Sequence, residues 1–169
     1  MFEKYFPTFK FKRVEDIPLE LIQKNNIKCI MFDMDNTLVN LKYESTNALK
    51  TWLKNAKDAG IICYILSNSR REHKVKKVAS MLDLEYILNA KKPKLDGFIK
   101  LQKKVNLQKE NLVIIGDQIF TDILGGNRFG ITTILVKPIH FLEVPEGMIK
   151  RPAEIPIKIA YYFHKRKSK

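Results

Sequence analysis

The sequence has few cysteines and no long hydrophobic run. Among its 169 residues are two cysteines, Cys29 and Cys63, and each lies in a short apolar stretch. Two separated cysteines cannot build a disulfide framework or a zinc cluster, so we expect buried thiols in a reducing cytoplasm. No stretch reaches the ~18 consecutive apolar residues of a membrane-spanning helix. The first residues, MFEKYFPTFKFKRVED, lack the apolar centre of a signal peptide, which also predicts a cytoplasmic protein.

Acidic residues are scarce relative to basic ones. The chain has 18 Asp and Glu against 31 Lys and Arg, which gives a formal net charge of +13. Such a charge favours anionic partners, whether phosphoesters, nucleic acid or acidic lipid, without choosing among them. A lysine-rich composition can equally be a habit of a whole proteome. The 45% hydrophobic content and the length fit one globular domain.

Short apolar runs alternate with segments of helical periodicity. Apolar runs that are nearly continuous are typical of strands buried on both faces of a parallel sheet. Their alternation with helices predicts right-handed crossovers, and therefore a three-layer, doubly wound α/β fold with a mostly parallel sheet. The runs are residues 27–33, 61–66, 85–88, 111–117 and 131–136, and the main expected helices are residues 44–59, 71–82, 95–105 and 119–129.

The chain divides into three expected parts. Residues 1–26 form an N-terminal extension packed on the core, residues 27–140 the catalytic core, and residues 141–169 an irregular segment followed by a basic helix. One interpretation packs the last helix on the core through its apolar residues, Ile155, Ile159 and Tyr162. The other places its aromatic and basic residues on an acidic lipid surface.

Polar and charged side chains follow the predicted strands at their carboxyl ends. The motifs are DMDNT at residues 33–37, SNS at 67–69, KKP at 91–93 and GDQIFTD at 116–122. In an open parallel sheet these ends meet at one edge, where ligands bind. Crowded carboxylates repel each other, and a divalent cation that prefers oxygen ligands relieves the repulsion. The sequence therefore predicts a Mg²⁺ site at this edge.

The four motifs, in this order and at these strand ends, resemble those of the haloacid dehalogenase-type (HAD) phosphohydrolases. In detail, DMDNTLV and GDQIFTDILGGNRFG resemble the YqeG-type HAD-IIIA phosphatases, and the likeness runs from about residue 5 to residue 140. The resemblance implies a HAD-like Rossmannoid fold without a cap domain. It also implies a Mg²⁺-dependent phosphomonoester hydrolase that acts through an aspartyl-phosphate.

The resemblance assigns roles to the acidic residues. Asp33 would be the nucleophile. Asp35 would protonate the leaving oxygen, take a proton from the attacking water and bind the metal through its backbone carbonyl. Asp33 and Asp117 would be direct Mg²⁺ ligands. Asp122 would reach the metal through water.

The resemblance also implies which residues bind the substrate phosphate. Ser67 and the backbone N–H of Asn68 would hold a phosphoryl oxygen, and Thr37 would steer the nucleophile by a hydrogen bond. Lys92 would neutralise the nucleophile and the transferring group. Lys92 is favoured over Lys91 because the family's lysine commonly precedes a proline. Taken alone, residues of DMDNT or SNS could cap helices, and Lys92 could be a solvated surface lysine. The order of the four motifs along the chain disfavours these alternatives.

The intervals between the motifs are too short for a cap. Between Thr37 and Ser67 lie 29 residues, and between Ser69 and Lys91 lie 21, each consumed by a helix and a strand. An open site suits a large or membrane-associated substrate. The resembling family includes an organellar branch that dephosphorylates phosphatidylglycerophosphate, so we expect a lipid phosphate and peripheral contact with an anionic membrane at its inner face. A soluble phosphomonoester is the close alternative.

Two other functional classes fit parts of the sequence. A non-catalytic nucleic-acid- or ribosome-associated binder would use the positive charge, but the chain has no recognised RNA-binding motif, which disfavours nucleic acid. A phosphoacceptor switch would share the sheet and the aspartate, but Asp35 supplies an acid–base group for rapid turnover. His73, His140 and His164 show no metal-binding spacing, so we expect surface or loop positions. The oligomeric state is left open by the sequence.

Overall fold

A parallel sheet of six strands forms the middle layer, one strand more than the sequence predicts. The computed structural model describes residues 2–140, 155–157 and 159–161, and within them the strand order is β1-β6-β5-β2-β3-β4. All neighbouring pairs are parallel, which confirms the doubly wound α/β fold. The strands are β1 (Phe9–Lys10), β2 (Cys29–Phe32), β3 (Ile62–Leu66), β4 (Glu85–Ile87), β5 (Leu112–Gly116) and β6 (Thr132–Leu135).

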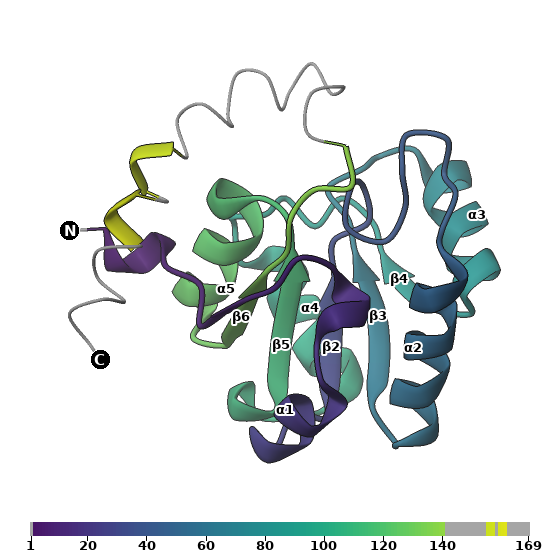
Figure 1. Cartoon of the computed structure of the whole chain (residues 1–169), viewed down its shortest axis with the longest axis horizontal. Helices are drawn as coiled ribbons and strands as arrows, with labels where there is room; N and C mark the ends of the chain where they lie inside the picture. Colours follow the sequence, from purple (N-terminus) through teal and green to yellow (C-terminus); the bar gives the residue numbers. More distant parts are fainter. Residues whose placement is uncertain (1, 141–154, 158, 162–169) are drawn as a thin grey trace.

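Helices cover both faces of this sheet (Figure 1). The helices α1, α2 and α3 contribute to the core on one face, and α4 and α5 to the core on the other. The predicted helix 119–129 begins instead with a π-helical turn, Ile119–Ile123, and only then becomes α5. The α-helices are α1 (Leu19–Lys24), α2 (Asn47–Asp58), α3 (Glu72–Leu82), α4 (Asp96–Val105) and α5 (Leu124–Phe129), with 3-10 turns at Glu3–Tyr5, Val14–Asp16 and Lys109–Asn111.

The sequence of the central strand β2 does not alternate between apolar and polar residues. All four of its residues are buried, because helices lie on both sides of the sheet. Ile30 and Phe32 belong to the core that contains α2, whereas Met31 belongs to the core that contains α4. The Phe32 ring meets Trp52 of α2 edge-to-face, with centroids 6.2 Å apart. A fully buried strand at the middle of the sheet is therefore what positions the loop that follows it.

The two cysteines are buried and unbonded, as predicted. Cys29 and Cys63 lie on neighbouring strands but belong to cores on opposite faces of the sheet, so they cannot form a disulfide. Burial raises the pKa of both thiols to about 12, so neither is a thiolate near neutral pH. Both act as small hydrophobic side chains.

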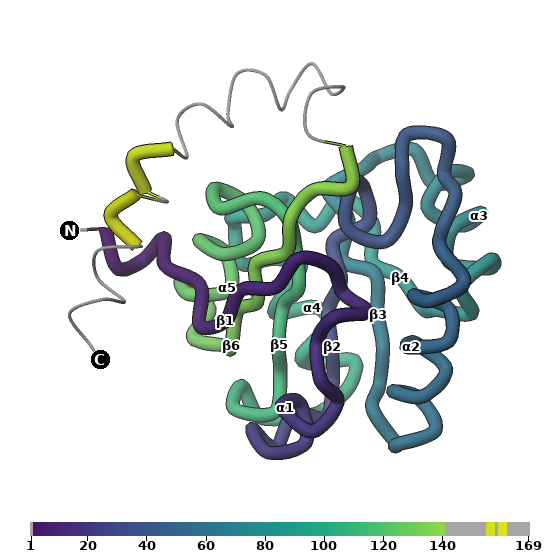
Figure 2. The backbone as a smooth tube through the Cα atoms, viewed as in Figure 1, coloured from purple at the N-terminus to yellow at the C-terminus, as the bar shows by residue number. Residues whose placement is uncertain are grey.

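The N-terminal segment supplies the edge strand that the sequence pattern does not reveal. Strand β1 runs beside β6 (Figure 2). Two further backbone hydrogen bonds continue the pairing: Phe11 N–H to Leu135 O at 3.0 Å, and Lys137 N–H to Lys12 O at 3.1 Å. A strand of two residues contains no apolar run or alternation that could be recognised.

Residues 155–157 and 159–161 are helical and lie near the N-terminus (Figure 1). Ile157 is buried, and the Tyr161 ring lies 5.4 Å from the ring of Phe6. Ile155 and Ile159 are 54% and 53% exposed. The prediction that Ile155 and Ile159 pack on the core is therefore wrong: the opposite side of this helix is packed. Ile157 joins a small cluster with Ile119, Ile123 and Leu135.

The remaining predictions for the C-terminal part fall on residues 141–154, 158 and 162–169. These residues, Tyr162 and His164 among them, lie outside the described part of the chain. Among the residues that the structure describes, none belongs to a helix with the length and apolar character needed to cross a membrane.

Candidate active site

The carboxyl ends of β2, β3 and β5 bring the predicted motifs to one edge of the sheet. Asp33 follows β2, Ser67 follows β3 and Asp117 follows β5. Carboxylate oxygens of Asp33, Asp117 and Asp122 lie within 4.8 Å of one another. Three of the four acidic residues that the motifs supply thus lie together, and the Asp35 carboxylate is not among them.

Lys92 lies within this acidic cluster. Its side chain is 1% exposed, and its ammonium donates to Asp33 Oδ1 at 2.8 Å and to Asp122 Oδ1 at 2.7 Å. Lys91 is exposed, so Lys92 is the lysine that meets the carboxylates. Burial alone would lower the pKa of Lys92, but the charges of Asp122 and Asp33 outweigh burial and raise it. Lys92 therefore carries its charge throughout the physiological pH range.

The side chain of Asn68 holds the backbone of Lys92. The Asn68 amide donates to Lys92 O at 2.9 Å and accepts from Lys92 N–H through its Oδ1 at 2.7 Å. The peptide bond from Lys92 to Pro93 is cis. A single amide can satisfy a donor and an acceptor together, so Asn68 fixes the chain where the lysine enters the site. The sequence assigns only the backbone of Asn68 to the site and gives no sign of this clamp.

Asp122 is completely buried beside the lysine. One carboxylate oxygen pairs with Lys92, and the other accepts the Gln118 N–H at 3.1 Å. Burial raises the pKa of Asp122 to about 6, against the lowering effect of Lys92, and the charge of Asp33 adds to the rise. A Cβ at Gly116 would overlap the Asp122 carboxyl, so glycine is needed there. The contact of Asp122 with Lys92 is a feature that the sequence does not predict.

The DMDNT loop has an exposed and a buried part. Asp35 is exposed, and the side chain of Asp33 is 13% exposed, whereas Asn36 and Thr37 are buried. The Thr37 hydroxyl donates to Asp117 Oδ1 at 3.4 Å, whereas the sequence leads us to expect it to steer the nucleophile. Asn36 adopts a left-handed φ of 62°, which turns the chain sharply. The turn leaves both aspartates at the open edge.

The segment after β6 is bound to the DMDNT loop. Ile139 N–H donates to Asn36 O at 3.0 Å, and His140 N–H donates to Asn36 Oδ1 at 3.3 Å. His140 therefore lies at the rim of the site, although its sequence context suggests an ordinary loop residue. His73 is exposed on α3, as expected. No spacing or motif in the sequence connects residue 36 with residues 139–140.

Ser67 is buried and faces the start of the next segment. Its Oγ accepts the Ser69 N–H at 3.1 Å. A serine hydroxyl that accepts one hydrogen bond still has its own O–H to donate. Ser67 can therefore serve both as a local turn residue and as a donor to a phosphoryl oxygen.

The cluster fits a magnesium ion by the chemistry of its donors. Asp33, Asp117 and Asp122 offer oxygen atoms only, which is the ligand type that Mg²⁺ prefers. Two of the three carboxylates also contact Lys92, which lowers the repulsion among them. The residues present are thus suited to a divalent cation next to a phosphate.

Comparisons with known proteins find phosphatases. The family model described as mitochondrial PGP phosphatase matches residues 2–140. A probable phosphatase YqeG from Bacillus subtilis is 39% identical over 141 residues, which are 82% of this chain and 81% of that protein. A phosphatidylglycerophosphate phosphatase 1 (chloroplastic/mitochondrial) from Arabidopsis thaliana is 25% identical over 153 residues, but the match covers only 42% of that longer protein and 82% of this chain.

Solved structures show the same fold at low identity. The cobalt-bound deoxy-D-mannose-octulosonate 8-phosphate phosphatase from Haemophilus influenzae superposes with a TM-score of 0.51 and 15% identity, over 75% of this chain and 98% of that one. A protein from Listeria monocytogenes gives a TM-score of 0.55 with 18% identity, over 73% and 97% of the two chains. At these identities the likeness supports the architecture alone.

Proposed function

Because the chain belongs to the mitochondrial PGP phosphatase family, as a YqeG-type HAD phosphatase, we propose that it hydrolyses phosphomonoesters through an aspartyl-phosphate on Asp33. The observation that carries the proposal is the contact of the Lys92 ammonium with Asp33, at 2.8 Å, beside Asp117 and Asp122. A charged lysine next to a carboxylate nucleophile stabilises the negative charge that a phosphoryl group brings.

In the first step, a carboxylate oxygen of Asp33 attacks the phosphorus. The bond from phosphorus to the leaving oxygen breaks, and the leaving oxygen takes a proton from Asp35. Asp35 is suited to this role because it follows two residues after Asp33 and is exposed at the mouth of the site. In the second step, Asp35 takes a proton from water, the hydroxide attacks the phosphorus, and Asp33 leaves as a carboxylate.

The metal site would be formed by the same aspartates. Asp33 and Asp117 would bind Mg²⁺ directly, the backbone carbonyl of Asp35 would be a further ligand, and Asp122 would act through water. When bound, the ion supplies positive charge to the phosphoryl oxygens. Thr37 keeps the Asp117 carboxylate in place by its hydrogen bond. Ser67 and the Asn68 N–H would hold the remaining phosphoryl oxygen.

We further propose a lipid phosphate monoester, such as phosphatidylglycerophosphate, as the substrate. Two features support a large substrate: a single helix and strand fill each interval between motifs, so no cap covers the described site, and Ile155 and Ile159 leave apolar side chains exposed near the basic C-terminal sequence. Exposed apolar residues beside cationic ones suit peripheral contact of a cytoplasmic protein with an anionic membrane. A soluble phosphomonoester is the competing substrate.

Phosphate release tests both parts of the proposal. Purified protein is assayed with phosphatidylglycerophosphate in mixed micelles, with sugar phosphates and with an aryl phosphate, each in Mg²⁺ and in EDTA. We expect Mg²⁺-dependent release that is fastest on the lipid, and a loss of roughly 10³-fold or more in Asp33→Asn. Full turnover by Asp33→Asn would refute the nucleophile. Faster turnover of a sugar phosphate would be consistent with the proposed mechanism but would refute the lipid substrate.

A further inference from the structure

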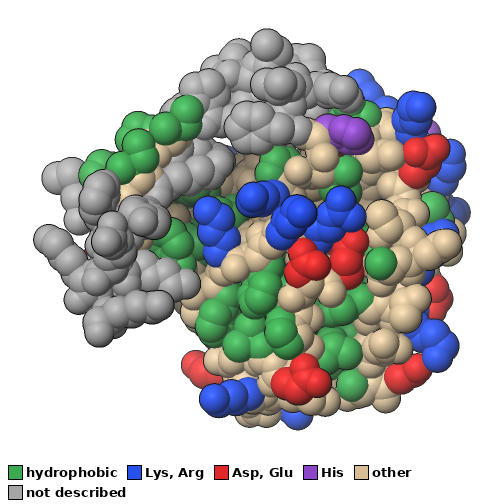
Figure 3. Space-filling model, in the orientation of Figure 1, with side chains coloured by type: hydrophobic (Ala, Val, Ile, Leu, Met, Phe, Trp, Pro, Cys, Tyr) green, Lys and Arg blue, Asp and Glu red, His purple; other side chains and the backbone are tan. Residues whose placement is uncertain are grey.

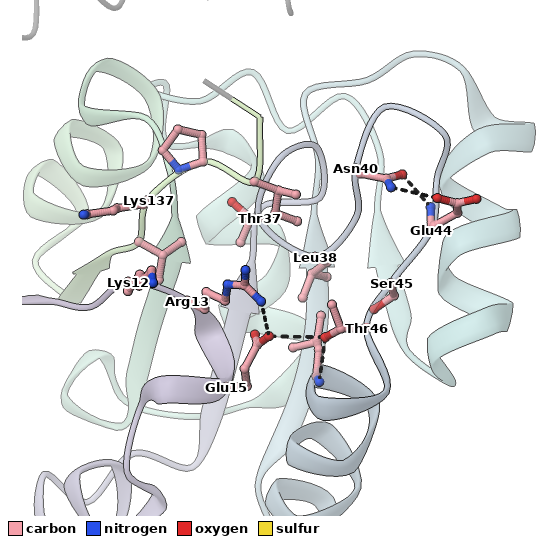
Figure 4. Close-up of a pocket in the computed structure, with 14 residues that line it drawn as sticks. Lys12, Arg13, Glu15, Thr37, Leu38, Asn40, Glu44, Ser45, Thr46 and Lys137 are labelled. Atoms are coloured by element: carbon pink, nitrogen blue, oxygen red, sulfur yellow. Dashed lines mark hydrogen bonds and ion pairs between the residues drawn. The ribbon is translucent and has the colours of Figure 1, made fainter. Parts of the chain in front are cut away.

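A hollow of about 420 Å³ lies beside the DMDNT loop (Figure 4). Four segments line it: residues 12–15, residues 37–40, residues 44–49 at the start of α2, and residues 136–139 after β6. Its volume lies within the ~300–1,000 Å³ typical of small-molecule sites. Thr37 lines this hollow and also donates to Asp117, so the hollow and the acidic cluster share a wall.

Basic residues line the hollow in the N-terminal segment and in the segment after β6. The hydrogen bond between Lys137 N–H and Lys12 O, at 3.1 Å, holds these two lysines side by side. Within the described residues neither Lys12 nor Lys137 forms an ion pair, and Arg13 has only Glu15, at 3.7 Å. In Figure 4, the Arg13 guanidinium reaches inward while Lys137 extends along the outer rim. Lys and Arg side chains form a band across this face (Figure 3).

The opposite wall offers hydrogen-bond donors. Thr46 caps α2, a helix of 12 residues, by accepting the Leu49 N–H at 3.0 Å, and the first turn of a helix carries backbone N–H groups without partners in the helix. Ser45 Oγ is buried and has no hydrogen-bond partner among the described residues. Figure 4 shows Ser45 beside Thr46 on this wall.

The acidic side chains of the hollow are already engaged. Glu15 accepts the Thr46 hydroxyl at 3.2 Å and faces Arg13, and Glu44 accepts the amide of Asn40 at 2.9 Å. The three basic side chains of the lining exceed these two acidic ones. The rest of the lining is largely apolar, and comprises Leu38, Leu49, Val136, Pro138 and Ile139.

We propose that this hollow is an accessory binding site for a phosphate ester that carries an apolar carbon group. Arg13 and Lys12 bind the phosphate because guanidinium and ammonium groups form charge-assisted hydrogen bonds to its oxygens. The first turn of α2 completes the polar side, and Leu38 and Ile139 contact the carbon group. The site does not depend on chemistry at Asp33. The ester is either a lipid headgroup or a soluble compound.

The test uses two probes and two matched double variants of the full chain. The first probe is dibutyl phosphate, a diester with apolar butyl groups that a phosphomonoesterase does not cleave, and its binding is followed by amide NMR shifts. The second is flotation with vesicles of phosphatidylcholine and phosphatidylglycerol in equal amounts. The binding variant is Lys12→Gln/Arg13→Gln. The control, Lys100→Gln/Lys103→Gln, removes the same charge from exposed positions of α4 on the other face of the sheet.

We expect the diester to shift the amides of Thr37, Ser45 and Leu49, and the binding variant to raise the dissociation constant about tenfold or more. The control should change it by less than about twofold. If the binding variant also loses vesicle binding, the ligand is a lipid headgroup; if vesicle binding is unchanged, the ligand is soluble. Equal diester affinity in all three proteins, or shifts confined to Asp33 and Ser67, would overturn the accessory site.

Discussion

Ion pairs in this protein occur in two contrasting regions. At the candidate active site, Lys92 and its partners Asp33 and Asp122 have side chains that are 1%, 13% and 0% exposed. On the helix surface, the side chains of Lys54 and Asp58 are 74% and 62% exposed. The distances are alike, 2.7–2.8 Å in the site and 2.8 Å on α2. Geometry alone therefore does not distinguish the two kinds of pair.

The difference is solvation. Water screens an exposed pair and replaces either partner when the other is removed, so such pairs add little stability. A buried ion without its partner has no such replacement, and breaking a buried pair costs ~3–5 kcal/mol. Stability does not explain the buried cluster, because apolar residues of similar volume would stabilise the fold at least as much. Under the proposed function, the cluster instead supplies fixed charge where the nucleophile and the cation would meet.

Lys92→Met should produce the largest loss of stability. The variant leaves Asp33 and Asp122 close together without a cation, so we expect the free energy of unfolding in EDTA to fall by about 3–5 kcal/mol. Removing the charge beside the nucleophile should also lower kcat by roughly 10²–10³-fold. Urea unfolding measures the first effect and phosphate release the second.

The double variant Lys92→Met/Asp122→Asn serves as the control for this prediction. Removing the second buried charge should restore part of the lost stability while leaving activity low, because the loss of stability comes from unpaired charge and the loss of activity from the missing lysine. A single variant as stable as the wild type would show that the two carboxylates do not depend on Lys92.

The parts of the site that could be predicted are those fixed by strand order. Asp33 and Asp117 follow buried apolar strands, and the ends of parallel strands meet at one edge, so their proximity follows from the sequence. The choice of Lys92 over Lys91 comes from the family resemblance alone, in which the lysine commonly precedes a proline. The helices α2, α3 and α4 carry regular apolar periodicity and lie within three residues of their predicted ends.

The features that escaped prediction depend on contacts between distant segments or on very short elements. The Asn68 clamp on Lys92 and the bond from His140 to Asn36 join loops that no periodicity relates. Strand β1 is too short to show a pattern. The π-helical turn before α5 cannot be separated from an α-helix by apolar spacing alone, since it occupies only five residues.

Asp122→Asn should change how the stability of the protein depends on pH. In the metal-free protein the pKa of Asp122 is raised from 3.8 to about 6. The folded chain then holds a proton that the unfolded chain releases, so the stabilising contribution is full below roughly pH 4 and is lost as pH rises through about 6. Asn does not titrate, so the variant lacks this pH dependence. As pH rises through this window, the free energy of unfolding of the variant should increase relative to that of the wild type by on the order of 3 kcal/mol.

Urea unfolding in EDTA at several pH values measures this gain. Glu110→Gln, which removes a carboxylate at an exposed surface position, is the control variant. If the free energies of unfolding of Asp122→Asn and the wild type had the same pH dependence, Asp122 would have the same pKa in the folded and the unfolded chain.

Lys54→Met should have the smallest effect, although it makes the same substitution as Lys92→Met. Lys54 pairs with Asp58 one helical turn away on α2, and the side chains of both are largely exposed. Lys and Met have similar helix propensities, so the substitution should not alter the stability of α2 through its backbone. Water solvates Asp58 once its partner is removed. We expect a urea midpoint and a phosphatase rate within experimental error of the wild type, with or without added salt. A loss of stability comparable to that of Lys92→Met would mean that burial is not what separates the two regions, since charge, substitution and pair distance are otherwise matched.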